Sequence, residues 1–175
     1  EAVFIYNDTL IMLDILVRDG DKWRAIEVKS SLSLNETYYQ DAALQYYVLN
    51  GCEVPISDMQ LMYVNENYVK GLDIDVNNLF IFKSVKEYAI QQLQSIDKKV
   101  NYFKEIVNLN NSPKVNIGTQ CFKPYTCEFL GHCWKKVPND SFLKTTALSD
   151  DEMFSLYNSG IQDNHRFKRL LNPLS

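Results

Sequence analysis

A turn between two β-rich runs constrains the fold of this chain more than any other feature. Asp19-Gly20-Asp21 supplies the turn, and the run before it alternates in polarity, with Asp14 on the face opposite an apolar set. The apolar set is Ile11, Leu13, Ile15 and Val17. Residues 22–30 follow the turn, so we expect them to return antiparallel to the first run as a β-hairpin.

The hairpin is expected to bring acidic residues together. Glu27 and Lys29 share one face of the second run. If the loop is Gly20-Asp21, Asp14 lies directly opposite Glu27, with Cβ atoms about 5 Å apart; if the loop is Asp19-Gly20, the two are diagonal neighbours at about 7–8 Å. Two carboxylates this close repel each other unless a cation lies between them.

A divalent cation would resolve that repulsion. Two carboxylates with open coordination positions suit Mg²⁺ or Mn²⁺, and we expect Asp14, Glu27 and Val28 as the metal-binding positions. A metal ion held there would activate a water molecule for attack on a phosphate. Lys29 would contact that water or stabilise the charge that grows on the phosphate. The alternative is a surface hairpin whose charged side chains form a solvated ladder.

A helix is predicted directly after the hairpin. Ser33-Leu34-Asn35-Glu36 resembles a capping box that opens a helix from about Thr37 to Asn50, and Gly51 would close it as a left-handed cap. Four residues recur at spacings of three and four on this helix and share a face: Tyr38, Asp41, Gln45 and Leu49.

The strand–strand–helix order, with the phrases IEVKSS and DAALQYYVL, resembles the RecB-like exonuclease branch of the PD-(D/E)XK nuclease superfamily. That branch includes CRISPR-associated RecB-like nucleases and the AddB nuclease domain. The resemblance implies an α/β fold, a restriction-endonuclease-like mixed sheet with flanking helices and a C-terminal cysteine-rich loop. It also places Gln45 beside the active site as a catalytic residue, although the family pattern Gln-x-x-x-Tyr has Leu49 at its last position here. An ordinary surface amide is the alternative for Gln45.

Three cysteines crowd into the segment CFKPYTCEFLGHCW, namely Cys121, Cys127 and Cys133. Thiolates bind soft or borderline metals, so the segment predicts an iron–sulfur cluster or zinc, with reduced free thiols or disulfides as alternatives. In the resembling nucleases a further cysteine upstream of the core completes a [4Fe–4S] site. No cysteine precedes Asp14, so the fourth ligand would be Cys52, His132 or a residue outside this chain.

Length and composition are typical of one intracellular α/β domain, because 175 residues with 46% hydrophobic content can bury a full core. The sequence has no signal peptide and no transmembrane run, which predicts a cytoplasmic protein with no membrane partner. A formal net charge of −4 is unlike the basic footprint of most DNA-binding domains. Candidate phosphate contacts are Lys98-Lys99 and Lys135-Lys136.

The remaining elements are predicted from periodicity and turn residues. Strands are expected at residues 2–6, 60–64 and 79–83, a long helix at 85–110 and a short helix at 150–161. The apolar stripe of the long helix would be core: Tyr88, Ala89, Leu93, Ile96, Val100, Phe103 and Val107. Residues 1–140 would form the nuclease core with its cysteine segment, and 141–175 a linker or the start of a following region in a larger RecB-like protein.

The resemblance implies a metal-dependent DNA nuclease, an exonuclease in DNA repair, recombination or defence. Its partners would be DNA and other domains of the same longer polypeptide. The alternative is a non-catalytic DNA-binding or interaction module that retains the nuclease fold.

Overall fold

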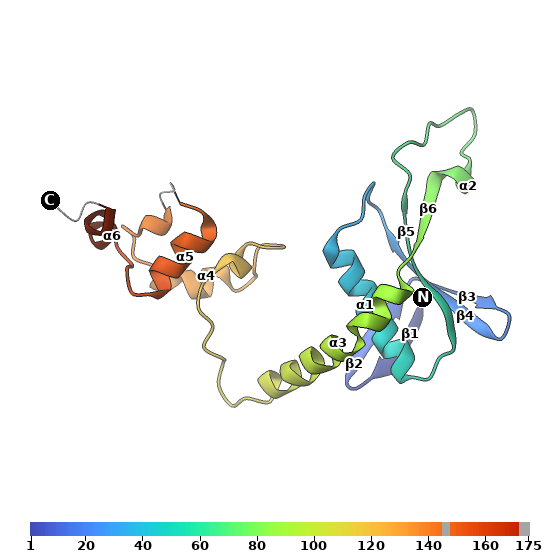
Figure 1. Ribbon diagram of the computed structural model, residues 1–175, viewed down its shortest axis with the longest axis horizontal. Coiled ribbons are helices and arrows are strands. Elements are labelled where there is room, and N and C mark those ends of the chain that lie inside the picture. Colours follow the sequence, from blue (N-terminus) through green and yellow to red (C-terminus); the bar gives the residue numbers. More distant parts are fainter. Residues whose placement is uncertain (145–147, 172–175) are drawn as a thin grey trace. The chain divides into compact units, whose positions relative to one another are not determined.

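The computed structural model describes residues 1–144 and 148–171. The chain divides into two compact units, the first spanning Glu1–Asn110 and the second beginning at Asn111 (Figure 1). The first unit is mixed α/β, with a mixed sheet and flanking helices, as the sequence predicted. No helix in the described ranges is long and apolar enough to cross a membrane.

The first unit opens with a two-stranded antiparallel hairpin, β1 (Ala2–Tyr6) and β2 (Thr9–Leu13). Asn7 and Asp8 turn the chain with positive φ angles of 48° and 58°, the backbone that a tight two-residue hairpin loop requires. The Asn7 side chain donates to the Tyr47 hydroxyl at 3.1 Å and accepts from Lys104 at 2.9 Å, which fixes this turn on the helices behind it.

A four-stranded sheet follows, in the order β3-β4-β5-β6. Its strands are β3 (Ile15–Asp19), β4 (Lys22–Lys29), β5 (Ile56–Val64) and β6 (Phe80–Ser84). Pairing is antiparallel between β3 and β4, parallel between β4 and β5, and antiparallel between β5 and β6. Asp19 pairs with Lys22, so Gly20-Asp21 is the hairpin loop, the first of the two expected registers.

The chain changes sheets at Asp14, and the single strand expected here is two strands. Leu13 pairs with Ala2 in one sheet, whereas Ile15 pairs with Ile26 in the other. The alternation of faces shifts at this break. Ile11 and Leu13 are buried as expected, but beyond Asp14 it is Leu16 that packs on the core, and Val17 is 43% exposed. The prediction of one continuous apolar face was therefore wrong past Leu13.

Helix α1 (Glu36–Gly51) forms the crossover between the parallel strands β4 and β5. Its N-cap is Asn35, whose side chain accepts the Tyr38 N–H at 3.2 Å, so the predicted capping box from Ser33 was wrong. Gly51 is still helical, and the residue with positive φ is Glu53, at 58°. The predicted left-handed cap at Gly51 was wrong as well.

Helix α3 (Lys86–Val107) packs against α1, and both contribute to one core with strands β2, β4 and β5 (Figure 1). Ala89 and Val100 are buried, and Tyr88, Leu93 and Ile96 pack against the core. Phe103 and Val107 are 59% and 82% exposed, so the predicted core stripe ends before the last turns of the helix. The short helix α2 (Val76–Leu79) lies in the segment between β5 and β6.

The second unit consists of short helices. They are η1 (Thr119–Cys121), α4 (Leu130–Cys133), η2 (Trp134–Lys136), η3 (Phe142–Lys144), α5 (Asp150–Asn158) and α6 (Asn164–Leu171). It has its own core: Ile117, Cys121, Val137, Phe142, Leu143, Met153, Phe154 and Tyr157. Helix α5 begins with a capping box between Ser149 and Glu152 and confirms the predicted short helix. The nuclease core expected at residues 1–140 stays a prediction, because the boundary between compact units does not show where a family domain ends.

Close packing explains the glycine at position 51. A β-carbon there would overlap the ring of Tyr6, which itself makes an edge contact with Tyr47 at 5.3 Å between centroids. We expect Gly51→Ala to lower the free energy of unfolding of the first unit by about 1–3 kcal/mol, because an extra carbon in a packed contact forces side chains to shift. Urea denaturation measures this loss. Gly71→Ala is the matched control, since nothing closer than 4.0 Å surrounds its β-carbon position, and an equal loss in both variants would contradict the packing argument.

Candidate functional site

Strand β4 carries Glu27 and Lys29 on its core-facing side, together with the fully buried Ala25. The side chains of Glu27 and Lys29 are only 10% and 15% exposed. Charged side chains are rarely buried this far unless they are paired. β4 therefore presents two ionic groups to the space beneath helix α1 instead of to solvent.

Asp14 reaches β4 through its carboxylate, whose Oδ2 accepts the Val28 N–H at 2.9 Å. The ladder between β3 and β4 ends at the pair Ile15 and Ile26. Continued in the same register, Leu13 would pair with Val28, but Leu13 has turned away to pair with Ala2. The Asp14 side chain takes the place of that lost strand partner. It thereby brings its carboxylate to the backbone beside Glu27.

Lys29 lies between two carboxylates. Its Nζ donates to Glu27 Oε1 at 2.8 Å and to Asp41 Oδ2 at 2.5 Å, and it lies 5.3 Å from the centre of the Tyr38 ring. Burial lowers the pKa of Lys29, but the hydrogen bonds to Asp41 and Glu27 outweigh it and leave that pKa above its ordinary value of 10.5. Lys29 is therefore a fixed cation in this site.

Glu27 is in the opposite electrostatic situation. Burial raises its pKa above the ordinary value of 4.5, and this desolvation outweighs the contrary effects of the Lys29 ammonium and the Gln45 amide. Within the described residues, Glu27 Oε2 and Gln45 Oε1 are buried and have no hydrogen-bond partner. Buried oxygens without a partner are costly, so this corner of the site is short of positive charge or of donors.

Helix α1 closes the site from the side. Gln45 is buried on it and lies next to Glu27, and Asp41 lies one turn earlier. The fold thus brings Asp14, Glu27, Val28, Lys29 and Gln45 together. Sequence reasoning placed Tyr38 and Asp41 on the helix face of Gln45 but gave them no role; their spacing from Gln45 was the signal that they belong to the site.

The predicted cysteine site lies in the second unit. Cys121 is buried in its core, the Cys127 N–H donates to the Cys121 carbonyl at 2.9 Å, and Cys133 lies on α4 after His132. All four cysteines of the chain are free thiols, and Cys52, in the first unit, donates to the Ile5 carbonyl at 3.3 Å. In the part of the chain that the structure describes, no three His, Cys, Asp or Glu side chains gather closely enough to hold a metal ion. The cysteine site stays a prediction.

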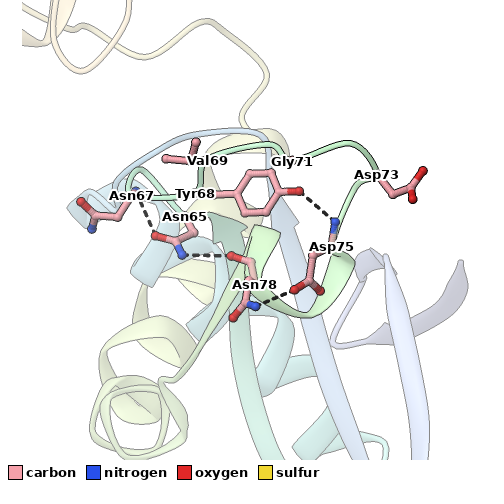
Figure 2. A pocket seen from close by; sticks show the side chains of 8 residues that line it. All are labelled: Asn65, Asn67, Tyr68, Val69, Gly71, Asp73, Asp75 and Asn78. Atoms are coloured by element: carbon pink, nitrogen blue, oxygen red, sulfur yellow. Dashed lines mark hydrogen bonds between the residues drawn. The ribbon is translucent and has the colours of Figure 1, made fainter.

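A separate polar hollow lies in the segment between β5 and β6 (Figure 2). It is lined by Asn65, Asn67, Tyr68, Val69, Gly71, Asp73, Asp75 and Asn78. The Tyr68 hydroxyl accepts the Asp75 N–H at 2.8 Å, and the Asn65 amide donates to the Asn78 carbonyl at 2.9 Å. These bonds join residues of the same segment, and none of the residues predicted for the site lines the hollow.

Comparison with known proteins adds no relative. No protein-family model matches the chain, and neither the curated proteins nor the solved structures give a match.

The buried Glu27 carboxyl makes stability depend on pH. A carboxyl whose pKa is higher in the folded chain than in the unfolded chain disfavours folding once pH rises above its ordinary value of 4.5, and this cost vanishes below that pH. We expect Glu27→Gln to be more stable than the wild type at pH 7, with the advantage disappearing as pH falls to about 4. Lys29 keeps Asp41 as its partner in this variant. Urea denaturation at both pH values measures the free energy of unfolding of the variant and of the wild type. A stability advantage of the variant that is smaller at pH 7 than at pH 4 would contradict the prediction.

Proposed function

We propose that this chain is a metal-dependent deoxyribonuclease of the RecB-like branch of the PD-(D/E)XK superfamily, an exonuclease with a restriction-endonuclease-like fold. The observation that carries the proposal is the convergence of Asp14, Glu27, Lys29 and Gln45 from a strand break, a strand and a helix. A solvated charge ladder explains this arrangement poorly, because Glu27, Lys29 and Gln45 are shielded from solvent.

The residues present fit a hard divalent cation. Mg²⁺ and Mn²⁺ prefer oxygen ligands, and the site offers the carboxylates of Asp14 and Glu27. Among the described residues, Glu27 Oε2 has no hydrogen-bond partner. The N–H and C=O of one residue in an extended strand point to the same edge, so the Val28 carbonyl faces the edge at which its N–H meets Asp14. These three groups would hold the ion.

Such an ion, when bound, would acidify an attacking water and neutralise charge on a phosphate. The protein's own groups do the rest. Lys29 keeps a fixed positive charge where negative charge grows on the scissile phosphate, and it needs no reorganisation to do so. Gln45 borders Glu27 and limits how that carboxylate can turn. DNA is the proposed substrate and partner, with other domains of a longer polypeptide supplying the basic surface that a net charge of −4 lacks.

Cleavage of end-labelled DNA tests the proposal. With Mg²⁺ or Mn²⁺ we expect products that chelation abolishes, and a loss of at least about 10²-fold in rate for Asp14→Asn and for Glu27→Gln, since each removes a ligand charge. Asp58→Asn is the matched control, because this strand carboxylate bonds Ser84 and Gln60 outside the site. Full activity in Glu27→Gln would place catalysis elsewhere. DNA binding by the wild type without any cleavage would favour the alternative of a non-catalytic module.

We further propose that Cys121, Cys127 and Cys133 hold an iron–sulfur cluster or zinc, with Cys52, His132 or a residue outside this chain as the fourth ligand. Metal analysis of protein purified without oxygen is expected to find iron, with a brown colour, or zinc. Cys127→Ser should lower the metal content. Cys52→Ser distinguishes the fourth ligand, because the content falls in this variant only if Cys52 contributes. Protein free of both metals after anaerobic purification would refute the site.

A further inference from the structure

Asp41 is the residue of the site to which neither the sequence pattern nor the resemblance to RecB-like nucleases assigns a role. It lies on α1, one turn before Gln45, and its Oδ2 accepts from Lys29 Nζ at 2.5 Å. Its side chain is 39% exposed, in contrast to the buried Glu27. Asp41 therefore reaches Lys29 from the solvent side, while Glu27 holds the same ammonium from the core side.

This arrangement has a geometric consequence for the cation site. A lysine side chain has four rotatable bonds, and its ammonium turns toward whichever anion is closest. With Asp41 present, the ammonium is divided between two carboxylates, and Glu27 Oε2 keeps no partner among the described residues. Without Asp41, Glu27 would be the only carboxylate among the described residues left to pair with Lys29, and the ammonium would lie across the oxygens that a cation needs.

We propose that Asp41 is a positioning residue, which holds the Lys29 ammonium beside the Glu27 carboxylate and keeps Glu27 Oε2 open for a divalent cation. The role rests on the proposed nuclease function, but the ion pair itself can be tested without metal or DNA. Tyr38 supports the same position, since its ring lies 5.3 Å from Lys29 Nζ and attracts the ammonium electrostatically.

The first test is ¹H–¹⁵N NMR of the lysine ammonium groups in the metal-free protein. A shielded, ion-paired ammonium exchanges its protons slowly, so wild type should show a Lys29 signal, assigned by its loss in Lys29→Arg. We expect Asp41→Asn to shift this signal, because the ammonium then pairs with Glu27 alone, and Asp41→Glu to return the signal to its wild-type position. Glu36→Gln is the matched control, because this carboxylate on the same helix bonds Tyr88 at 2.7 Å and is expected to leave the signal unchanged. A Lys29 signal that keeps its wild-type position in Asp41→Asn would overturn the proposal.

The second test is steady-state cleavage of DNA with Mn²⁺. Asp41→Asn is expected to lower kcat by about 10²-fold, the cost of misplacing a group by about 1 Å, with KM for DNA unchanged and with recovery in Asp41→Glu. A merely structural role would instead lower the urea midpoint and leave the kcat of the folded protein intact, which would overturn the proposal. If wild type cleaves no DNA, the nuclease function fails, whereas the NMR signal still decides whether Asp41 holds Lys29.

Discussion

The hydrogen bond between the Asp14 carboxylate and the Val28 N–H is the interaction on which the arrangement of the site depends. A polypeptide that leaves one sheet for another must satisfy the backbone groups of the strand it abandons, because an unpaired buried N–H costs free energy. Here the side chain at the break does so. The same bond that repairs the ladder also fixes a carboxylate beside Glu27. The position of one predicted metal ligand is thus a consequence of how the strand break is stabilised.

Burial of Glu27 works against the stability of the fold. Its carboxylate loses hydration, and Lys29 and Gln45 only partly compensate, which is why its pKa rises. Ion pairs buried in this way are poor sources of stability, and apolar residues of similar size often stabilise a fold at least as well. Places where a sequence breaks the ordinary rules of packing are typically functional. Glu27 Oε2, which has no hydrogen-bond partner in the part of the chain that the structure describes, is such a place, and the proposed cation would supply the positive charge that it lacks.

Local patterns predicted much of this fold, and non-local pairing explains the differences. The Asp-Gly turn predicted the hairpin and limited its register to two possibilities, and alternating polarity identified the strands, because both signals act over a few residues. The strand break at Asp14 has no local sequence signal, because it depends on Leu13 pairing with Ala2 in a separate sheet. The role of Gly51 was misjudged for the same reason: the Tyr6 ring that excludes a side chain there comes from a distant strand. Exposure of the last turns of α3 likewise depends on where the core ends.

The candidate site follows the same division between local and distant causes. Spacing along β4 was enough to place Glu27 and Lys29 on one face, and helical spacing placed Gln45 and Asp41 on another. Whether those two faces meet depends on the crossover from β4 to β5, which lays α1 over the sheet. Because the crossover brings an acidic helix residue to a strand lysine already paired with Glu27, Lys29 is constrained from two sides before any ligand arrives. A cation held in advance costs little reorganisation during a reaction, which is the property that a phosphodiester-cleaving site requires and a solvated charge ladder lacks.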